Sequence, residues 1–253
     1  MSDEPRLDEQ ALSEAAEMTL SRQLDEVENI DVDLRTNLLK LVQGQADSVS
    51  IVGQGLVVQK DIRLEEVELH APSIAINLLS VILGEVELNQ PVDATVRLVL
   101  TEQDINHALQ SDYIRSKWQG VELKVDSQSV TLEPQQLEVQ LPGGGRIGMR
   151  GTVLLNERDK TQRIGFTGVI RPRLHWQSLL LEAFQCTEGE GVSLELAIAA
   201  LNQVKELINL PYFDLEGIAL YLKELEVQKG RLTVYAEAYI QQFPKLNVTA
   251  QSS

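Results

Sequence analysis

The stretch from Pro91 to Ser111 constrains the fold most, because a strand pattern in it runs directly into the start of a helix. Apolar side chains occupy every second position from Val92 to Leu100, which is the period of a strand with one buried face. Thr101 then suits a helix N-cap, and the acids at positions 102 and 104 suit the positive end of a helix dipole. A strand and a helix that each bury one apolar face predict a mixed fold without an obvious reacting group.

The rest of the chain favours many antiparallel strands and few helices. Strand patterns fall at 30–34, 49–58, 62–76, 121–125, 129–132, 137–141, 147–155, 163–176, 216–228 and 231–240. Helical patterns fall at 10–28, 37–42, 78–83 and 192–210. A change of parity within 62–76 predicts a bulge at Glu65-Glu66. These elements predict an α+β fold in one elongated domain, residues 10–246, between flexible ends at 1–9 and 247–253.

Two runs of the chain resemble a known family. They are GQADSVSIVGQGLVVQKDIRLEEVEL (44–69) and ILGEVELNQPVDATVRLVLTEQDINHALQS (82–111), and both resemble the LmeA-like phospholipid-binding proteins of actinobacteria and cyanobacteria. The resemblance covers residues 25–245. It implies a tubular lipid-binding-like fold, in which a long curled antiparallel sheet wraps an apolar helix around a hydrophobic cavity. It also implies binding of phospholipid or another apolar lipid, as a carrier or sensor in membrane lipid homeostasis.

The residues agree with an aliphatic cavity, because aromatic side chains make up only 4% of the chain. The predicted cavity lining consists of Leu78, Leu79, Ile82, Leu98, Leu100, Leu194, Ile198 and Leu201. Burying one CH₂ group is worth about 0.8 kcal/mol relative to water. Relative to a bilayer, which is already apolar, the gain is close to zero, so such a cavity suits uptake and release of lipid.

The charge of the chain is unevenly distributed. The net charge of −16 argues against nucleic acid as a partner. Residues 143–176, however, hold 7 bases and 2 acids. Within this basic band, Arg171, Arg173 and His175 share one face of a predicted strand, and together with Arg163 they could bind an anionic lipid headgroup. The alternative interpretation is a solvated strand face whose arginines pair with the surplus carboxylates.

No motif in the sequence indicates catalysis. The glycines at 143, 145 and 148 match G-x-G-x-x-G, but a strand pattern follows them, so they predict a hairpin turn. The histidines at 70, 107 and 175 have no metal-ligand neighbours at close spacing, and Cys186 lies beside acids rather than beside a base that could activate it. The sequence therefore predicts a protein without enzymatic activity, metal or cofactor, and a small loop or core role for Cys186.

Location and partners follow from the composition. The acidic N-terminus, the single cysteine and the absence of an apolar run of 18 residues predict a cytoplasmic protein that at most touches a membrane transiently. Residues 1–33 hold 11 acids and 2 bases, so a helix at 10–28 could dock a basic protein partner. The alternatives to lipid binding are a soluble acidic scaffold without a cavity and an enzyme acting on an apolar substrate. A pigment or isoprenoid could replace the phospholipid.

Overall fold

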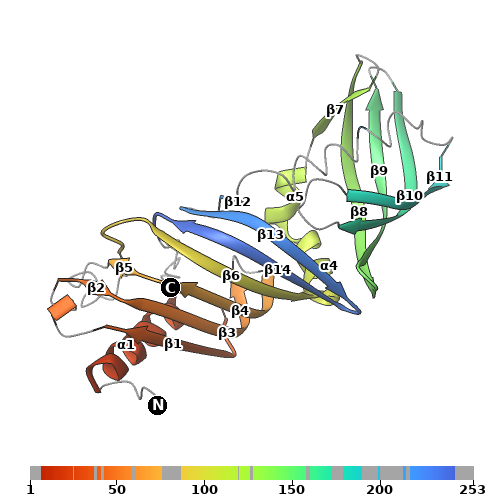
Figure 1. Ribbon diagram of the computed structural model, residues 1–253. Helices are drawn as coiled ribbons and strands as arrows, with labels where there is room; N and C mark the ends of the chain where they lie inside the picture. Colours follow the sequence, from red (N-terminus) through yellow and green to blue (C-terminus); the bar gives the residue numbers. More distant parts are fainter. Residues whose placement is uncertain are drawn as a thin grey trace, which may run out of the picture. The chain divides into compact units, whose positions relative to one another are not determined.

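The chain divides into two compact units, each built mainly from antiparallel strands (Figure 1). The computed structural model describes residues 7–24, 26–36, 39–40, 43–58, 61–75, 87–118, 120–125, 128–157, 160–172, 179–189, 199, 213–214 and 217–242. Unit 1 comprises residues 1–99, 211–223 and 234–253, and unit 2 comprises residues 100–210 and 224–233. The α+β class is confirmed, whereas the single domain over 10–246 stays a prediction.

A seven-stranded sheet organises the described part of unit 1. Its order is β1-β3-β4-β6-β14-β13-β12. The bounds are β1 (Asn29–Arg35), β3 (Ser48–Val58), β4 (Ile62–Ala71), β6 (Val92–Thr101), β12 (Phe213–Asp214), β13 (Ile218–Gln228) and β14 (Arg231–Ile240). A small pair, β2 (Gln45–Ala46) and β5 (Ile74–Ala75), lies outside this sheet. β1, β3, β6, β13 and β14 match the predicted strands closely, because alternation of apolar and polar residues is a direct consequence of the strand's period. The strand predicted at 62–76 is divided into β4 and β5, and β2 and β12 were not predicted.

The core of unit 1 lies on one face of its sheet. Ala94, Val96 and Ile240 are among the buried residues there, and Leu12, Ala16 and Leu20 of helix α1 (Leu7–Gln23) pack against them. Spacings of four put these three helical residues on one face. The predicted packing of the N-terminal helix on the sheet is confirmed for them, although α1 begins and ends earlier than residues 10–28.

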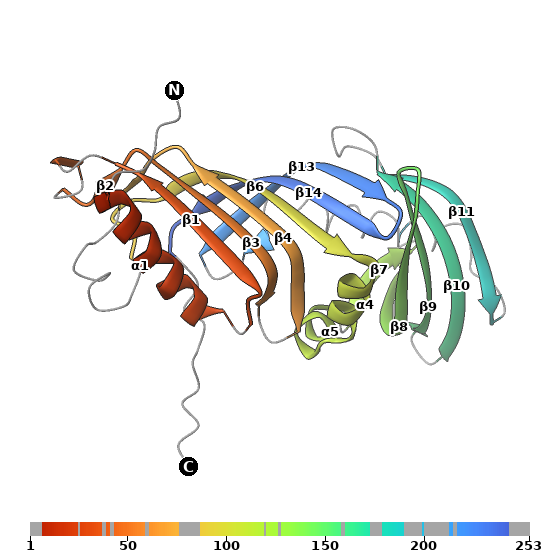
Figure 2. The same cartoon turned by 90° about the horizontal axis from the view of Figure 1, so that it is seen from below.

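A second face of α1 hydrogen-bonds the edge strand β1, beside which the helix lies (Figure 2). Three residues of α1, spaced four apart, each accept a hydrogen bond from a backbone N–H. Two of these N–H groups belong to β1, and the third belongs to Thr36, the residue after it. The three bonds join Thr36 N to Glu9 Oε1 (2.8 Å), Leu34 N to Ser13 Oγ (3.1 Å) and Val32 N to Glu17 Oε1 (3.0 Å). This side-chain ladder covers polar groups that an edge strand otherwise exposes.

A five-stranded sheet organises the described part of unit 2. Its order is β11-β10-β9-β8-β7. The bounds are β7 (Val121–Val125), β8 (Gln128–Gly143), β9 (Arg146–Glu157), β10 (Lys160–Pro172) and β11 (Leu179–Glu188). Strands predicted at 129–132 and 137–141 are one strand, β8, because a register shift between Pro134 and Gln136 accommodates the proline without ending the strand. The sequence analysis missed β11, on which Cys186 lies opposite Phe166.

Glycines form the turn between β8 and β9, as predicted. Gly143, Gly144 and Gly145 have φ of 88°, 64° and 72°, a backbone conformation that residues with a Cβ rarely adopt. At Gly143 an added Cβ would also lie 3.2 Å from the backbone nitrogen of Lys229. Lys229 belongs to the β13–β14 turn, whose Gly230 donates to the carbonyl of Leu141 at 2.8 Å.

The junction between β6 and helix α4 (Glu102–Gln110) forms as predicted. Thr101 Oγ1 accepts a hydrogen bond from Asp104 N at 3.1 Å, and Asp104 Oδ2 accepts one from Thr101 N at 3.0 Å. This reciprocal capping box satisfies two N–H groups at the helix start. A second short helix, α5 (Asp112–Trp118), follows directly.

The predicted bulge at Glu65-Glu66 is wrong. Leu64 pairs with Leu56 and Glu66 with Gln54, so the register between β4 and β3 is the same on both sides of Glu65. The local irregularity falls instead on Gly55 of β3, which has φ of 59°. A glycine can take that conformation without an extra residue in the ladder, which a parity count cannot detect.

We expect Glu9→Ala to lower the free energy of unfolding by about 1–3 kcal/mol, because it leaves the buried N–H of Thr36 without this acceptor. Glu9→Gln keeps an acceptor oxygen and should cost less. Glu14→Ala, on the exposed side of α1, should stay within about 0.5 kcal/mol of wild type. Urea unfolding followed by circular dichroism measures all three. Equal losses for Glu9→Ala and Glu14→Ala would contradict the ladder.

Candidate functional site

The predicted site residues fall partly within the described structure. Of the predicted cavity lining, Leu98 packs against the core of unit 1 and Leu100 is half-buried on β6. The remaining lining positions, Leu78, Leu79, Ile82, Leu194, Ile198 and Leu201, lie outside the described residues. Arg173 and His175 of the predicted headgroup site also lie outside them, whereas Arg163 and Arg171 lie on β10.

The described arginines of the basic band pair with carboxylates. The ion pairs are Arg146–Glu182 (2.7 Å), Arg150–Glu138 (2.6 Å), Arg163–Glu188 (3.7 Å) and Arg171–Glu182 (2.6 Å). Such pairs agree with the alternative interpretation of the band as a solvated strand face whose arginines pair with carboxylates. The headgroup role of Arg163, Arg171, Arg173 and His175 stays a prediction.

Glu182 joins two strands of unit 2 electrostatically. It lies on β11 and accepts hydrogen bonds from Arg146 of β9 and Arg171 of β10. The hydrogen bond from Arg146 lowers the pKa of Glu182 most; burial raises it in part, and the Arg171 bond and both guanidinium charges lower it further. The result is a pKa below the ordinary value of a glutamate, so this carboxylate is ionised at neutral pH.

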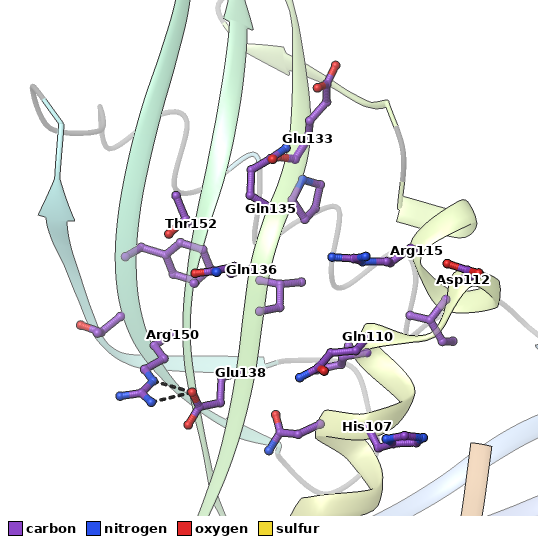
Figure 3. A pocket seen from close by; sticks show the side chains of 18 of the residues that line it. His107, Gln110, Asp112, Arg115, Glu133, Gln135, Gln136, Glu138, Arg150 and Thr152 are labelled. Carbon is purple, nitrogen blue, oxygen red and sulfur yellow. Dashed lines mark hydrogen bonds and ion pairs between the residues drawn. The ribbon is translucent and has the colours of Figure 1, made fainter. Parts of the chain in front are cut away.

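The described part of unit 2 contains an open hollow of about 1790 Å³ between α4, α5 and the exposed edge of β8 (Figure 3). The hollow is larger than common ligand pockets, which measure roughly 300–1,000 Å³. From the helices the lining takes Gln103, Asn106, His107, Leu109, Gln110, Asp112, Ile114 and Arg115. From the sheet it takes residues 133–138 of β8, residues 150–152 of β9, Phe166 and Thr167 of β10, and Thr187 of β11.

Side chains of α4 determine where this hollow begins. Beyond Leu132, β8 is no longer paired with β7, and α4 takes the place of that strand. Asn106 accepts from Val139 N at 2.7 Å and donates to Val139 O at 2.8 Å, and Glu102 accepts from Leu141 N at 2.6 Å. As in unit 1, side chains four residues apart on a helix form hydrogen bonds with backbone groups two residues apart on a strand.

The ladder on β8 stops after Val139. Backbone groups of a strand alternate in direction, so the N–H and C=O of Leu137 point to the same side as those of Val139. Gln110 is one turn after Asn106, but its side-chain amide has no hydrogen bond with the described residues. The edge of β8 at Leu137 therefore faces the hollow.

The hollow joins an apolar wall to a polar opening. Leu109, Ile114, Leu137 and Phe166 contribute its apolar lining. The ring of Phe166 also stacks on that of Phe184, with centroids 6.2 Å apart, and Phe184 is 40% exposed. The apolar part of the lining is therefore a minority of it, and Phe166 connects that part to the exposed Phe184 of β11.

Arg115 is the unpaired cation in this lining. Arg150 donates to Glu138 through two nitrogens, whereas Arg115 has no ion pair or side-chain hydrogen bond with the described residues. Figure 3 shows Arg115 and Gln110 extending from the helices toward β8; Asp112 of α5 lines the same hollow. The hollow can therefore offer a guanidinium to a ligand without first breaking a described ion pair.

The sequence analysis missed this site, although one signal for α5 is present. Ser111 Oγ accepts from Ile114 N at 3.2 Å, which makes Ser111 the cap of a second helix, and Asp112 follows in the first turn. Nothing in the sequence indicates that α4 binds β8, because the bonded residues are 33 and 39 positions apart.

Within the part of the chain that the structure describes, no group of three or more His, Cys, Asp or Glu side chains is placed to hold a metal ion. The helices of that part are also each too short or too polar to cross a bilayer.

Comparison with known proteins decides the family. The model of the LmeA-like phospholipid-binding family matches residues 6–237. The chain belongs to this family. The match spans nearly the whole sequence and confirms the resemblance found at 44–69 and 82–111. No curated protein and no solved structure matches the chain.

We expect Glu182→Gln to destabilise the protein at pH 7 but not in acid. Because folding lowers the pKa of Glu182, its ionised form stabilises the fold above the ordinary glutamate pKa, and that stabilisation is lost as pH falls through the lowered value. The difference in urea midpoint between wild type and variant should shrink as pH falls from 7 to about 3. Glu188→Gln, whose pair with Arg163 is longer and more exposed, should show a smaller difference. A difference that does not change with pH would contradict this account.

Proposed function

We propose that this protein binds a phospholipid without enzymatic chemistry and acts as a carrier or sensor of membrane lipid. The observation that carries the proposal is membership of the LmeA-like phospholipid-binding family over residues 6–237. The hollow of unit 2 supports it, because its lining combines aliphatic and aromatic side chains with an arginine that has no ion pair among the described residues. A phospholipid is an amphiphile with the same two parts.

The energetics favour exchange over permanent capture. A 16-carbon acyl chain gains on the order of 12 kcal/mol on leaving water for an apolar site. It gains almost nothing on leaving a bilayer for such a site, so small differences at the polar end decide which way the lipid moves. Transient contact with a membrane is part of this proposal, and a cytoplasmic location agrees with it.

We extend the proposal to the architecture of the family. A curled sheet would wrap an apolar helix at 192–210, and acyl chains would lie between them. Ala199 belongs to this predicted helix and packs near the buried cluster of Val130, Leu155 and Ile164 in unit 2. Of the predicted lining residues, Leu194, Ile198 and Leu201 belong to this predicted helix.

The scaffold alternative has less support. It assigns the acids of the N-terminal helix to a basic partner, but Glu9 and Glu17 are acceptors for the backbone of β1. A partner that took these two carboxylates would first have to break the hydrogen bonds at the sheet edge.

We expect native mass spectrometry of gently purified protein to show a bound species of lipid mass, which organic extraction then identifies. Leu109→Gln should reduce the bound fraction, because it places an amide in the apolar wall. Met18→Gln, which changes an exposed apolar residue of α1, should leave it unchanged. Thermal melts check that each variant is folded.

Two results would contradict the proposal. The first is a mass without ligand that persists after incubation with mixed phospholipids. The second is extraction of a pigment or isoprenoid in place of a phospholipid, which would keep an apolar site but change its ligand class.

A further inference from the structure

The open end of the α4–β8 ladder leaves backbone polar groups facing the hollow. Glu102 and Asn106 bond Leu141 and Val139, and the next pair in that series is Gln110 with Leu137. Along the helix, four residues advance about 6.0 Å. Two residues of a strand advance about 6.6–6.8 Å, so the two repeats diverge slowly. At Gln110 the helix ends, and no described bond completes the third pair.

This open position leaves two kinds of donor in the same hollow as Arg115. The N–H of Leu137 points to the hollow by strand alternation, and the Gln110 amide extends toward β8 (Figure 3). Phosphate oxygens accept hydrogen bonds from amides and form strong, often bidentate bonds with a guanidinium.

The lining also contains acids. Glu138 is paired with Arg150 at 2.6 Å, whereas Glu133, which accepts from Asn156 Nδ2 at 3.0 Å, and Asp112 of α5 keep their negative charge in the hollow. Within the described lining, Arg115 is the arginine that has no ion pair with the described residues.

We propose that Arg115 binds the phosphate of the lipid headgroup, assisted by Gln110 and the backbone N–H of Leu137. The glycerol and the first part of the acyl chains then contact Leu109, Ile114 and Phe166. This inference rests on the proposed function and names its polar subsite, which is separate from the basic band predicted from the sequence. The ligand chemistry is a phosphate ester, with a lipid as its source.

The test is calorimetric titration of the full chain with three probes. Dihexanoylphosphatidylglycerol carries both phosphate and chains, dihexanoylglycerol lacks the phosphate, and glycerol phosphate lacks the chains. We expect Arg115→Gln to weaken binding of the first about tenfold or more, and to leave the affinity for dihexanoylglycerol unchanged. Gln110→Glu should act in the same direction, because it adds a negative charge beside the phosphate.

Arg171→Gln tests the rival headgroup site that the sequence predicts in the basic band. Because Arg171 is engaged with Glu182, we expect this variant to keep more of the wild-type affinity for the phospholipid probe than Arg115→Gln does. The inference is overturned if Arg171→Gln loses binding while Arg115→Gln does not, or if Arg115→Gln loses dihexanoylglycerol to the same extent. Equal affinity of wild type for glycerol phosphate and the phospholipid would assign the site to free phosphate esters. Wild type that binds neither lipid probe would instead overturn the proposed function itself.

Discussion

Helix side chains hydrogen-bond the outer edge of a strand in both units, and much of the rest of the structure depends on this interaction. On β1 the acceptors are Glu9, Ser13 and Glu17 of α1. On β8 they are Glu102 and Asn106 of α4. The side chains and the backbone groups stay in step because four helical residues and two strand residues advance by similar lengths. It satisfies backbone groups that would otherwise invite pairing with another chain.

The same interaction creates the candidate site. Since Asn106 fixes α4 against Val139, the end of α4 and the start of α5 are held beside residues 133–138 of β8. The hollow lies where the ladder stops. Its position therefore depends on the length of α4, which Ser111 ends by bonding its N–H and hydroxyl to Ala108 O.

The composition of the chain does not reveal which of its arginines pair with carboxylates. The chain carries a net charge of −16, and the described arginines of the basic band pair with glutamates on neighbouring strands. Exposed pairs of this kind contribute little to stability individually. Arg150 of the hollow is engaged in this way, whereas Arg115, which lies outside the basic band, has no ion pair with the described residues.

The sequence alone determined the local elements of this protein. Period-two alternation predicted β3, β6, β7, β9 and β14, the capping residues at 101 and 104 predicted the start of α4, and the glycines at 143, 145 and 148 predicted the β8–β9 turn. These features follow from neighbouring residues. Only the tertiary structure decided that Glu9 is buried against Thr36, that Asn106 bonds Val139 and that Arg171 pairs with Glu182. Each of these pairs joins residues 11 to 33 positions apart, and the chain's periodicity contains no record of which distant backbone group a polar side chain will meet.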